Sequence, residues 1–208
     1  MKPTKYFVEI GSCDFDTLNE TLGGKGWGGV VVEPISEYLD NLTKHNSVCY
    51  INAALDVMPG TRTMNVFNKD VVSRDRDYAG MSSFAEYTNP QNEAHVTPRT
   101  VETVTYQYVI QKSGIPQVDF LKIDTEGHDM VVLNQVIYEG HWRPKVIKAE
   151  HKHIQGGAYA MKNFLEDKGY LVYQEFNDVY AIDTQLRPDP FGSHFEINPN
   201  SAQHGQGM

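Results

Sequence analysis

The sequence has few cysteines and a shortage of basic residues. Cys13 and Cys49 are the two cysteines among 208 residues, so we expect no disulfide framework, and a reducing cytoplasm suits the chain. The 18 lysines and arginines are outnumbered by 27 acidic residues, which gives a formal net charge of -9, and they form no cluster. Because nucleic-acid binding needs many phosphate-neutralising side chains, no nucleic-acid partner is expected.

Long apolar runs are also missing. No run approaches the roughly 18 residues of a membrane span, and the first apolar strand begins too early for a signal peptide to precede it. We therefore expect a cytoplasmic protein with no membrane partner. The length allows one sizeable core, and we predict a single domain over residues 1–183 and a polar tail over 184–208.

Three apolar segments end in acidic residues, and a glycine follows two of them closely. Glu9 and Gly11 close the first segment, Glu33 closes the second, and Asp124 and Glu126 close the third. The carboxyl ends of parallel strands meet at one edge of a sheet, where open α/β folds bind their ligands. This pattern indicates an enzyme with its site at that edge.

Apolar periodicity predicts alternating strands and helices, which is typical of an α/β fold with a doubly wound, Rossmann-like and mostly parallel sheet. We expect strands near residues 5–10, 29–33, 48–53, 120–124 and 144–150, and helices near 14–22, 36–44, 127–138 and 159–168. An antiparallel hairpin turning at Asn177-Asp178 should close the sheet. Between the predicted strands at 48–53 and 120–124 we expect a short hairpin over residues 58–67 and a polar lid or substrate loop over residues 68–99.

The distance between Gly11 and Glu33 indicates the kind of ligand. Glu33 follows Gly11 by roughly 20 residues, the separation at which a nucleotide-binding βαβ unit places the acid that binds ribose hydroxyls. An adenosine-containing cofactor is therefore expected. An NAD(P)-dependent oxidoreductase is an alternative, although the sequence lacks the GxGxxG pattern of its pyrophosphate site.

Several blocks of sequence resemble the FkbM-type methyltransferases, which have the class I S-adenosylmethionine-dependent fold. The resemblance extends to about Asp183, and its most specific piece is KIDTEG at 122–127, which contains Asp124 and Glu126. The blocks are VEIGS at 8–12, VVVEP at 30–34, INAAL at 51–55, MSSF at 81–84, FLKIDTEGHDMVVL at 120–133, VIKAEHKH at 146–153 and KGY at 168–170.

The resemblance implies an S-adenosylmethionine-dependent O-methyltransferase that acts on a hydroxyl of a sugar, glycan or small metabolite. It places Glu9 near the methionine part of the cofactor, Glu33 on the ribose and Ile35 on the adenine. Phe15 stands where the family usually has a second glycine, so the first loop should approach the ligand less closely. The candidate cofactor-binding residues are Glu9, Gly11, Ser12, Asp14, Glu33, Pro34, Ile35, Asn52, Ala53 and Asp124.

Methyl transfer to a hydroxyl needs a nearby proton acceptor, and histidine has the side chain whose ordinary pKa is closest to neutral. The candidate catalytic residues are Asp124, Glu126, Glu150 and His151. Candidates for contact with the substrate are Met81, Ser82, Ser83 and His128. These acids and histidines include ligand types of cation-dependent methyltransferases, but no metal-binding motif is present, so no metal residue is assigned.

Two further questions stay open at this point. A non-catalytic module that keeps the fold and binds the cofactor without turnover is an alternative to an enzyme, and Phe15 favours it. The oligomeric state is open as well, with a homodimer among the alternatives.

Overall fold

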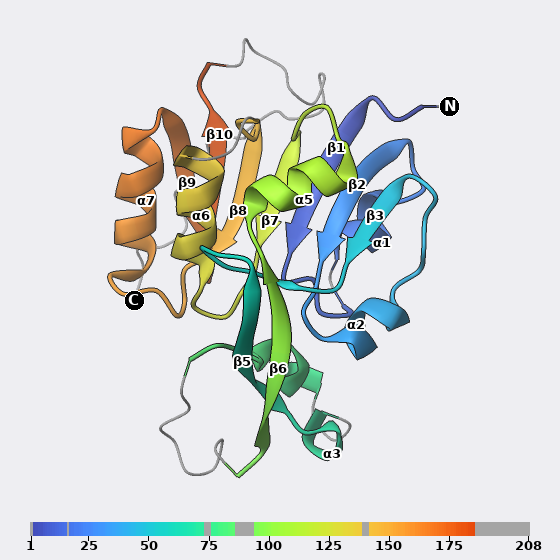
Figure 1. Ribbon diagram of the computed structural model, residues 1–208. Helices are drawn as coiled ribbons and strands as arrows, with labels where there is room; N and C mark the ends of the chain where they lie inside the picture. Colours follow the sequence, from blue (N-terminus) through green and yellow to red (C-terminus); the bar gives the residue numbers. More distant parts are fainter. Residues whose placement is uncertain (1, 16, 73–75, 86–93, 139–141, 186–208) are drawn as a thin grey trace, which may run out of the picture.

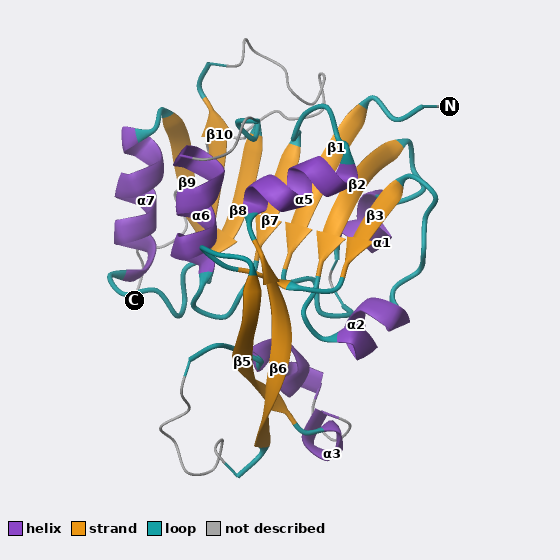
Figure 2. Cartoon of the chain, in the orientation of Figure 1, coloured by secondary structure: helices purple, strands orange, loops and turns teal. Residues whose placement is uncertain are grey.

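The computed structural model describes residues 2–15, 17–72, 76–85, 94–138 and 142–185. Its main sheet has seven strands in the order β3-β2-β1-β7-β8-β10-β9 (Figures 1 and 2). These strands are β1 (Lys5–Ile10), β2 (Trp27–Val32), β3 (Val48–Ile51), β7 (Phe120–Ile123), β8 (Val146–Glu150), β9 (Tyr170–Glu175) and β10 (Asp178–Asp183).

Strands β3, β2, β1, β7 and β8 pair in parallel, and β10 pairs antiparallel with β8 and β9. The predicted fold class, a Rossmann-like mostly parallel sheet with an antiparallel hairpin, is therefore confirmed. The predicted limits of β1 agree with the structure, and β2, β3, β7 and β8 differ from theirs by a few residues. The hairpin turns at Phe176 and Asn177, because Asp178 already belongs to β10.

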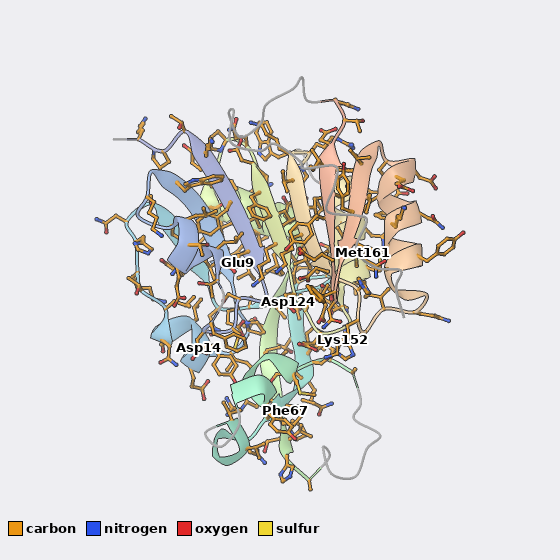
Figure 3. All side chains as sticks on the ribbon, turned by 180° about the vertical axis from the view of Figure 1, so that it is seen from behind. Glu9, Asp14, Phe67, Asp124, Lys152 and Met161 are labelled. Carbon is orange, nitrogen blue, oxygen red and sulfur yellow. The ribbon has the colours of Figure 1, made fainter. Side chains whose placement is uncertain are left out.

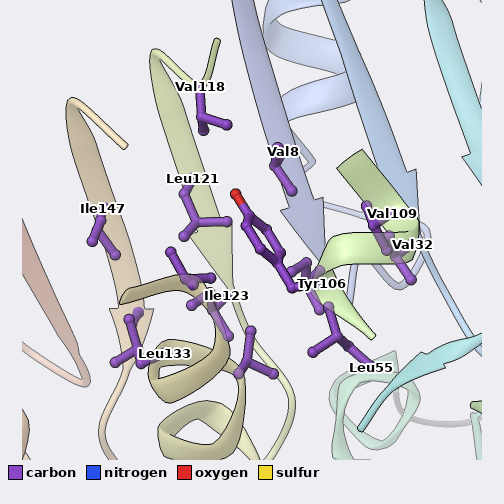
Figure 4. Close-up of a cluster of buried hydrophobic side chains, with 14 of the residues drawn as sticks. Val8, Val32, Leu55, Tyr106, Val109, Val118, Leu121, Ile123, Leu133 and Ile147 are labelled. Atoms are coloured by element: carbon purple, nitrogen blue, oxygen red, sulfur yellow. The ribbon is translucent and has the colours of Figure 1, made fainter. Parts of the chain in front are cut away.

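Helices cover both faces of this sheet. Helices α5 (Tyr106–Ser113), α6 (Asp129–Tyr138) and α7 (Gly157–Asp167) lie in front of it in Figure 1, and α1 (Leu18–Leu22) lies behind. Residues along β1 alternate between the two layers: Val8 packs with Tyr106 (Figure 4), whereas Phe7 packs with Leu18. Because β1 is buried on both faces, its sequence reads as an apolar run.

Helix α1 begins at Leu18, with Thr17 as its N-cap, rather than at the predicted residue 14. Helix α2 (Ser36–Asn41) is shorter than predicted. None of the described helices has the length and apolar character that crossing a membrane requires. The predicted tail lies outside the described residues from position 186 onward.

An insertion between β3 and β7 builds a second sheet that extends away from the carboxyl edge of the main sheet (Figure 1). Its strands are β4 (Ala54–Leu55), β5 (Gly60–Phe67) and β6 (Val96–Val104). The predicted hairpin within 58–67 is wrong: β5 is one strand, and it pairs antiparallel with β6, which starts inside the predicted polar loop. Between them lie α3 (Lys69–Val72) and a 3-10 helix, η1 (Arg76–Met81).

Candidate functional site

A cavity of about 450 Å³ lies where the carboxyl edge of the main sheet meets the insertion. Figure 3 shows Asp124 between the sheet and the insertion, with Lys152 on the same side. The lining residues are Ile10, Gly11, Ser12, Cys13, Phe15, Val32, Glu33, Pro34, Ile35, Tyr38, Ala53, Ala54, Leu55, Met64, Gly80, Met81, Ser82, Phe84, Lys122, Asp124, Thr125, Glu126, His128, Glu150, Lys152 and Asn177.

Gly11 ends β1 in a left-handed conformation, with φ of +75°. Its N–H donates to the carbonyl of Val32 at 3.0 Å, and a Cβ at this position would lie 1.8 Å from the carbonyl oxygen of Asp124. The glycine therefore lets the chain turn while the ends of β1, β2 and β7 stay in contact.

Glu33 is buried at the end of β2, and backbone N–H groups hold both of its carboxylate oxygens. Cys13 donates to one oxygen and Ile35 to the other, each at 2.8 Å. Burial raises the pKa of Glu33 to about 7, against the opposing effect of these hydrogen bonds. The Asn52 side chain points to the backbone here and donates to the carbonyls of Glu33 and Pro34. The carboxylate is fixed at the cavity wall and can accept further hydrogen bonds.

Cys13 and Phe15 belong to the loop after Gly11. Burial raises the pKa of the Cys13 thiol to about 12, so the group is not an activated nucleophile. Phe15 lines the cavity with 43% of its surface exposed, and its ring reaches toward Gly80 of the insertion. The ring therefore forms part of the wall and leaves the cavity open.

Glu9 points away from this cavity. It is fully buried, and its carboxylate accepts hydrogen bonds from the backbone N–H groups of Leu18 and Asn19 at the start of α1. The Lys122 ammonium lies 3.6 Å from the same carboxylate and itself lines the cavity. Burial raises the pKa of Glu9 and the Lys122 charge opposes that shift. The structure thus gives Glu9 partners in α1 and β7, and its predicted contact with the cofactor stays a prediction.

Asp129 organises the loop between β7 and α6. Its buried carboxylate accepts hydrogen bonds from the Thr125 hydroxyl at 2.9 Å and from the Gly127 N–H at 3.3 Å. Burial raises the pKa of Asp129 to about 6. Glu126 lies between these contacts with φ of 51°, so the extended strand has already ended there. The loop nevertheless delivers both Asp124 and Glu126 to the cavity.

Glu126, Glu150 and His153 converge at this loop. One ligand atom of each lies within 4.8 Å of those of the other two, and His153 Nε2 is 3.1 Å from a carboxylate oxygen of Glu126. Burial, followed by repulsion from other carboxylates, raises the pKa of Glu126 to about 8 and that of Glu150 to about 7. Burial also lowers the pKa of His153. The site therefore holds several groups that change protonation near neutral pH.

The insertion is docked onto the same loop. Ser83 donates its hydroxyl to the backbone carbonyl of Glu126 at 2.7 Å, and Phe84 packs edge-on against His128. His128 Nε2 lies 3.2 Å from Asp56, which Arg62 also contacts at 2.9 Å. Burial lowers the pKa of His128, although Asp56 opposes the shift. A cavity-lining imidazole is thus fixed by residues of the insertion.

Most of the predicted site residues share the cavity. Those that line it are Gly11, Ser12, Glu33, Pro34, Ile35, Ala53, Met81, Ser82, Asp124, Glu126, His128 and Glu150. Those described outside the lining are Glu9, Asp14, Asn52, Ser83 and His151. Asp14 accepts a hydrogen bond from Asn41, and His151 lies 3.1 Å from the carbonyl of Phe176.

Sequence reasoning assigned no role to other residues of this site: Cys13, Tyr38, Met64, Lys122, Lys152 and Asn177. Phe84 lay in the predicted lid, and the neighbouring His153 lay in the VIKAEHKH block, but neither was among the candidate site residues. Lys122 carried a usable signal, because a lysine inside an otherwise apolar strand needs a buried partner. Met64 and Phe84 belong to the insertion, whose pairing had not been predicted. Asn177 reaches the cavity through the hairpin turn, which gave no signal of function.

Three comparisons with known proteins show what this chain is similar to. The methyltransferase FkbM domain family matches residues 9–172. The crystal structure of methyltransferase FkbM from Methylobacillus flagellatus KT aligns with a TM-score of 0.54 and 13% identity, over 86% of this chain and 43% of that one. This chain thus spans less than half of that protein, and the likeness concerns the fold. The curated proteins gave no match. Since the family match covers more than half of the sequence, the chain belongs to the methyltransferase FkbM domain family.

Proposed function

We propose that this protein transfers a methyl group from S-adenosylmethionine to a hydroxyl of a sugar, glycan or small metabolite. The observation that carries the proposal is that Gly11, Glu33 and Asp124, from three strands, line one cavity at the carboxyl edge of the sheet. Ligands of doubly wound folds bind at this edge. Membership of the methyltransferase FkbM domain family supports the same activity.

The half of the cavity at β1, β2 and β3 suits an adenosine. The Glu33 carboxylate, oriented by Cys13 and Ile35, accepts hydrogen bonds from the two ribose hydroxyls. Ile35 and Ala53 line the wall beside it, and the small side chain of Ala53 leaves room for a planar base. Each hydrogen bond to the charged carboxylate contributes about 1.5–3 kcal/mol.

The half of the cavity at β7 and β8 suits the methyl acceptor. The acceptor oxygen attacks the methyl carbon in line with the breaking carbon–sulfur bond, the sulfonium becomes a neutral thioether, and the hydroxyl proton passes to a base. Glu126 and Glu150 are candidates for that base, because pKa values of about 8 and about 7 are close to neutral. Asp124 stays a candidate for orienting the acceptor or the sulfonium.

The charged side chains that line this half of the cavity limit the chemical class of acceptor that can bind there. The acids Asp124, Glu126 and Glu150 line it together with the cations Lys122 and Lys152, and Lys122 is already paired with the buried Glu9. An acceptor that carries phosphate or carboxylate near its reactive hydroxyl would be repelled by these acids. A neutral polyhydroxyl compound therefore fits the lining best, and a cytoplasmic location, where the cofactor is available, is part of the proposal.

Calorimetry with S-adenosylhomocysteine tests the cofactor assignment. We expect saturable binding to the wild-type protein and binding that is about 10–100-fold weaker in Glu33→Gln, which keeps the shape but loses the charge. Glu37→Gln, on an adjacent helix, is the matched control. Folded protein that binds nothing at millimolar ligand would refute the proposal, and binding of NADH instead would favour an oxidoreductase.

Turnover is tested separately by following methyl transfer to a panel of sugars, glycans and small hydroxylated metabolites. A methylated product is expected from at least one neutral polyhydroxyl acceptor. Tight binding of S-adenosylhomocysteine with no product across the panel would favour the non-catalytic module.

A further inference from the structure

We propose that Glu126, Glu150 and His153 form a binding site for a divalent first-row metal ion such as Mn²⁺. The site would lie at the rim of the cavity, beside the proposed acceptor position. The binding site itself stands independently of the methyl-transfer proposal, and only its use for the acceptor depends on that proposal.

The geometry of the three groups is that of ligands around one ion. Oxygen and imidazole ligands lie about 2.0–2.5 Å from such a metal, so two of them are separated by no more than about 5 Å. The ligand atoms of Glu126, Glu150 and His153 all lie within 4.8 Å of one another. The 3.1 Å between His153 Nε2 and the Glu126 carboxylate is also the spacing of neighbouring ligands at right angles around an ion.

One carboxylate oxygen of this group lacks a hydrogen-bond donor among the described residues. Glu150 Oε2 is buried and has no hydrogen-bond donor among the described residues. Leaving a buried carboxylate oxygen without a donor is unfavourable, because the oxygen loses its hydrogen bonds to water and gains none in the protein. A bound cation would satisfy it and would also offset the repulsion that Glu150 and Glu126 receive from Asp124.

The folded loops explain how the groups meet. Glu126 comes from the β7–α6 loop, held in its left-handed conformation beside the Ser83 contact, and Glu150 ends β8. His153 follows in the turn after β8, and Gly127 gives it space: a Cβ there would lie 3.3 Å from the Cβ of His153. Because the ligands come from two separate loops, no contiguous metal motif exists in the sequence.

The mixture of ligands selects the class of metal. Two carboxylates favour Mn²⁺ and Mg²⁺, whereas an imidazole favours first-row transition metals over Mg²⁺ and Ca²⁺. Three protein ligands leave coordination positions open, and Glu126 and Glu150 both line the cavity. The open positions can take oxygens of a polyhydroxyl acceptor, and coordination would lower the pKa of the reacting hydroxyl.

A direct ion pair between protonated His153 and Glu126, with Lys152 nearby, is the alternative that needs no metal. It predicts no specific affinity for a divalent ion. Electrostatic attraction of ions to the acidic protein as a whole is a second alternative, and it predicts weak binding that no single side chain controls.

Titration with Mn²⁺ at 0.15 M ionic strength, followed by electron paramagnetic resonance without cofactor or acceptor, separates these cases. We expect saturable binding of one ion, weakened at least tenfold in each of Glu126→Gln, Glu150→Gln and His153→Gln. His151→Gln and Glu102→Gln, which change a histidine and an acid outside the cluster, should bind as the wild type does.

Circular dichroism establishes that each variant is folded, and His153→Gln, at a side chain that is 39% exposed, is the variant least disturbing to the core. Absence of saturable binding below 1 mM Mn²⁺ would overturn the proposal, as would binding that folded His153→Gln retains in full. Metal binding without binding of S-adenosylhomocysteine would keep the metal site and refute the proposed function instead.

Discussion

The carbonyl oxygen of Asp124 occupies the space in which a side chain at Gly11 would begin, 1.8 Å from the position of a Cβ. The contact is between two backbones, so neither partner can rotate away. It ties the end of β1 to the end of β7 at the point where both turn toward the cavity.

Gly11→Ala should therefore disrupt the protein more than an ordinary surface glycine would. The clash with Asp124 adds to the strain of a left-handed alanine, and we expect a loss of at least about 3 kcal/mol in the free energy of unfolding. Gly26→Ala is the matched control: φ is +84° there too, but nothing lies within 4 Å of its Cβ. Urea unfolding of both variants gives the comparison, and equal losses would contradict the role of the contact.

Binding of S-adenosylhomocysteine should strengthen as pH rises from 6 to 8. The pKa of Glu33 is raised to about 7, so the carboxylate that we propose to accept the ribose hydrogen bonds is largely protonated at pH 6 and ionised at pH 8. Calorimetry across this range should give a rising affinity for the wild type and a nearly flat profile for Glu33→Gln. An identical pH dependence in both proteins would assign it to another group.

Stability of the metal-free protein should change with pH in the opposite direction. The pKa values of Asp129, Glu150 and Glu126 are raised to about 6, about 7 and about 8, so folding favours their protonated forms. Their contribution is complete below about pH 4, where the unfolded chain is protonated as well, and is lost as pH rises through 6–8. Thermal melts in EDTA should show a lower Tm at pH 8.5 than at pH 6.

In the melts each kcal/mol corresponds to roughly 2–4 °C for a chain of this size. Glu150→Gln should reduce the pH dependence, because the amide stays neutral over the whole range. A Tm that rises from pH 6 to pH 8.5 would show that other groups dominate.

Asp56→Asn should impair turnover more than cofactor binding. The substitution weakens the contact of Asp56 with His128, which joins the insertion to the cavity wall, and the contact of Asp56 with Arg62 within the insertion. Without that anchor we expect kcat/KM for methyl transfer to fall about tenfold, with the affinity for S-adenosylhomocysteine nearly unchanged.

Glu37→Gln provides the control for this effect, because Glu37 pairs with Arg99 of the insertion at 2.9 Å but lies outside the cavity lining. Equal losses in the two variants would mean that general loosening of the insertion, rather than the position of His128, lowers the rate.

The edge of the sheet could be predicted from the sequence because it depends on local signals. Gly11, Glu33 and Asp124 each follow directly after an apolar run, and parallel strands bring such positions together whatever the rest of the chain does. Glu9 is an acid like Glu33 and Asp124, but it lies inside β1, two residues before Gly11. Its direction was decided by which helix packs on that face, a tertiary property that alternation alone does not reveal.

Two other misses have physical causes as well. His151 rather than His153 was among the candidate catalytic residues, but β8 ends at Glu150, and the turn that follows brings the later histidine to Glu126. Helix α5 was not predicted, although Thr105 caps its start and Gly114 ends it, because the preceding segment was interpreted as an irregular loop. The pairing of β6 with β5 is long-range and had no local signature.

The β5–β6 ladder leaves the main sheet just after β3 and returns directly into the cap of α5, so both of its ends connect to the framework of strands and helices. Its side chains Met64, Val66 and Phe67 belong to one buried cluster with Ile35 and Tyr38, which follow β2. A change in this arm would therefore reach the cavity wall at Ile35 as well as the loop at Glu126, so the two sides of the cleft have to evolve together.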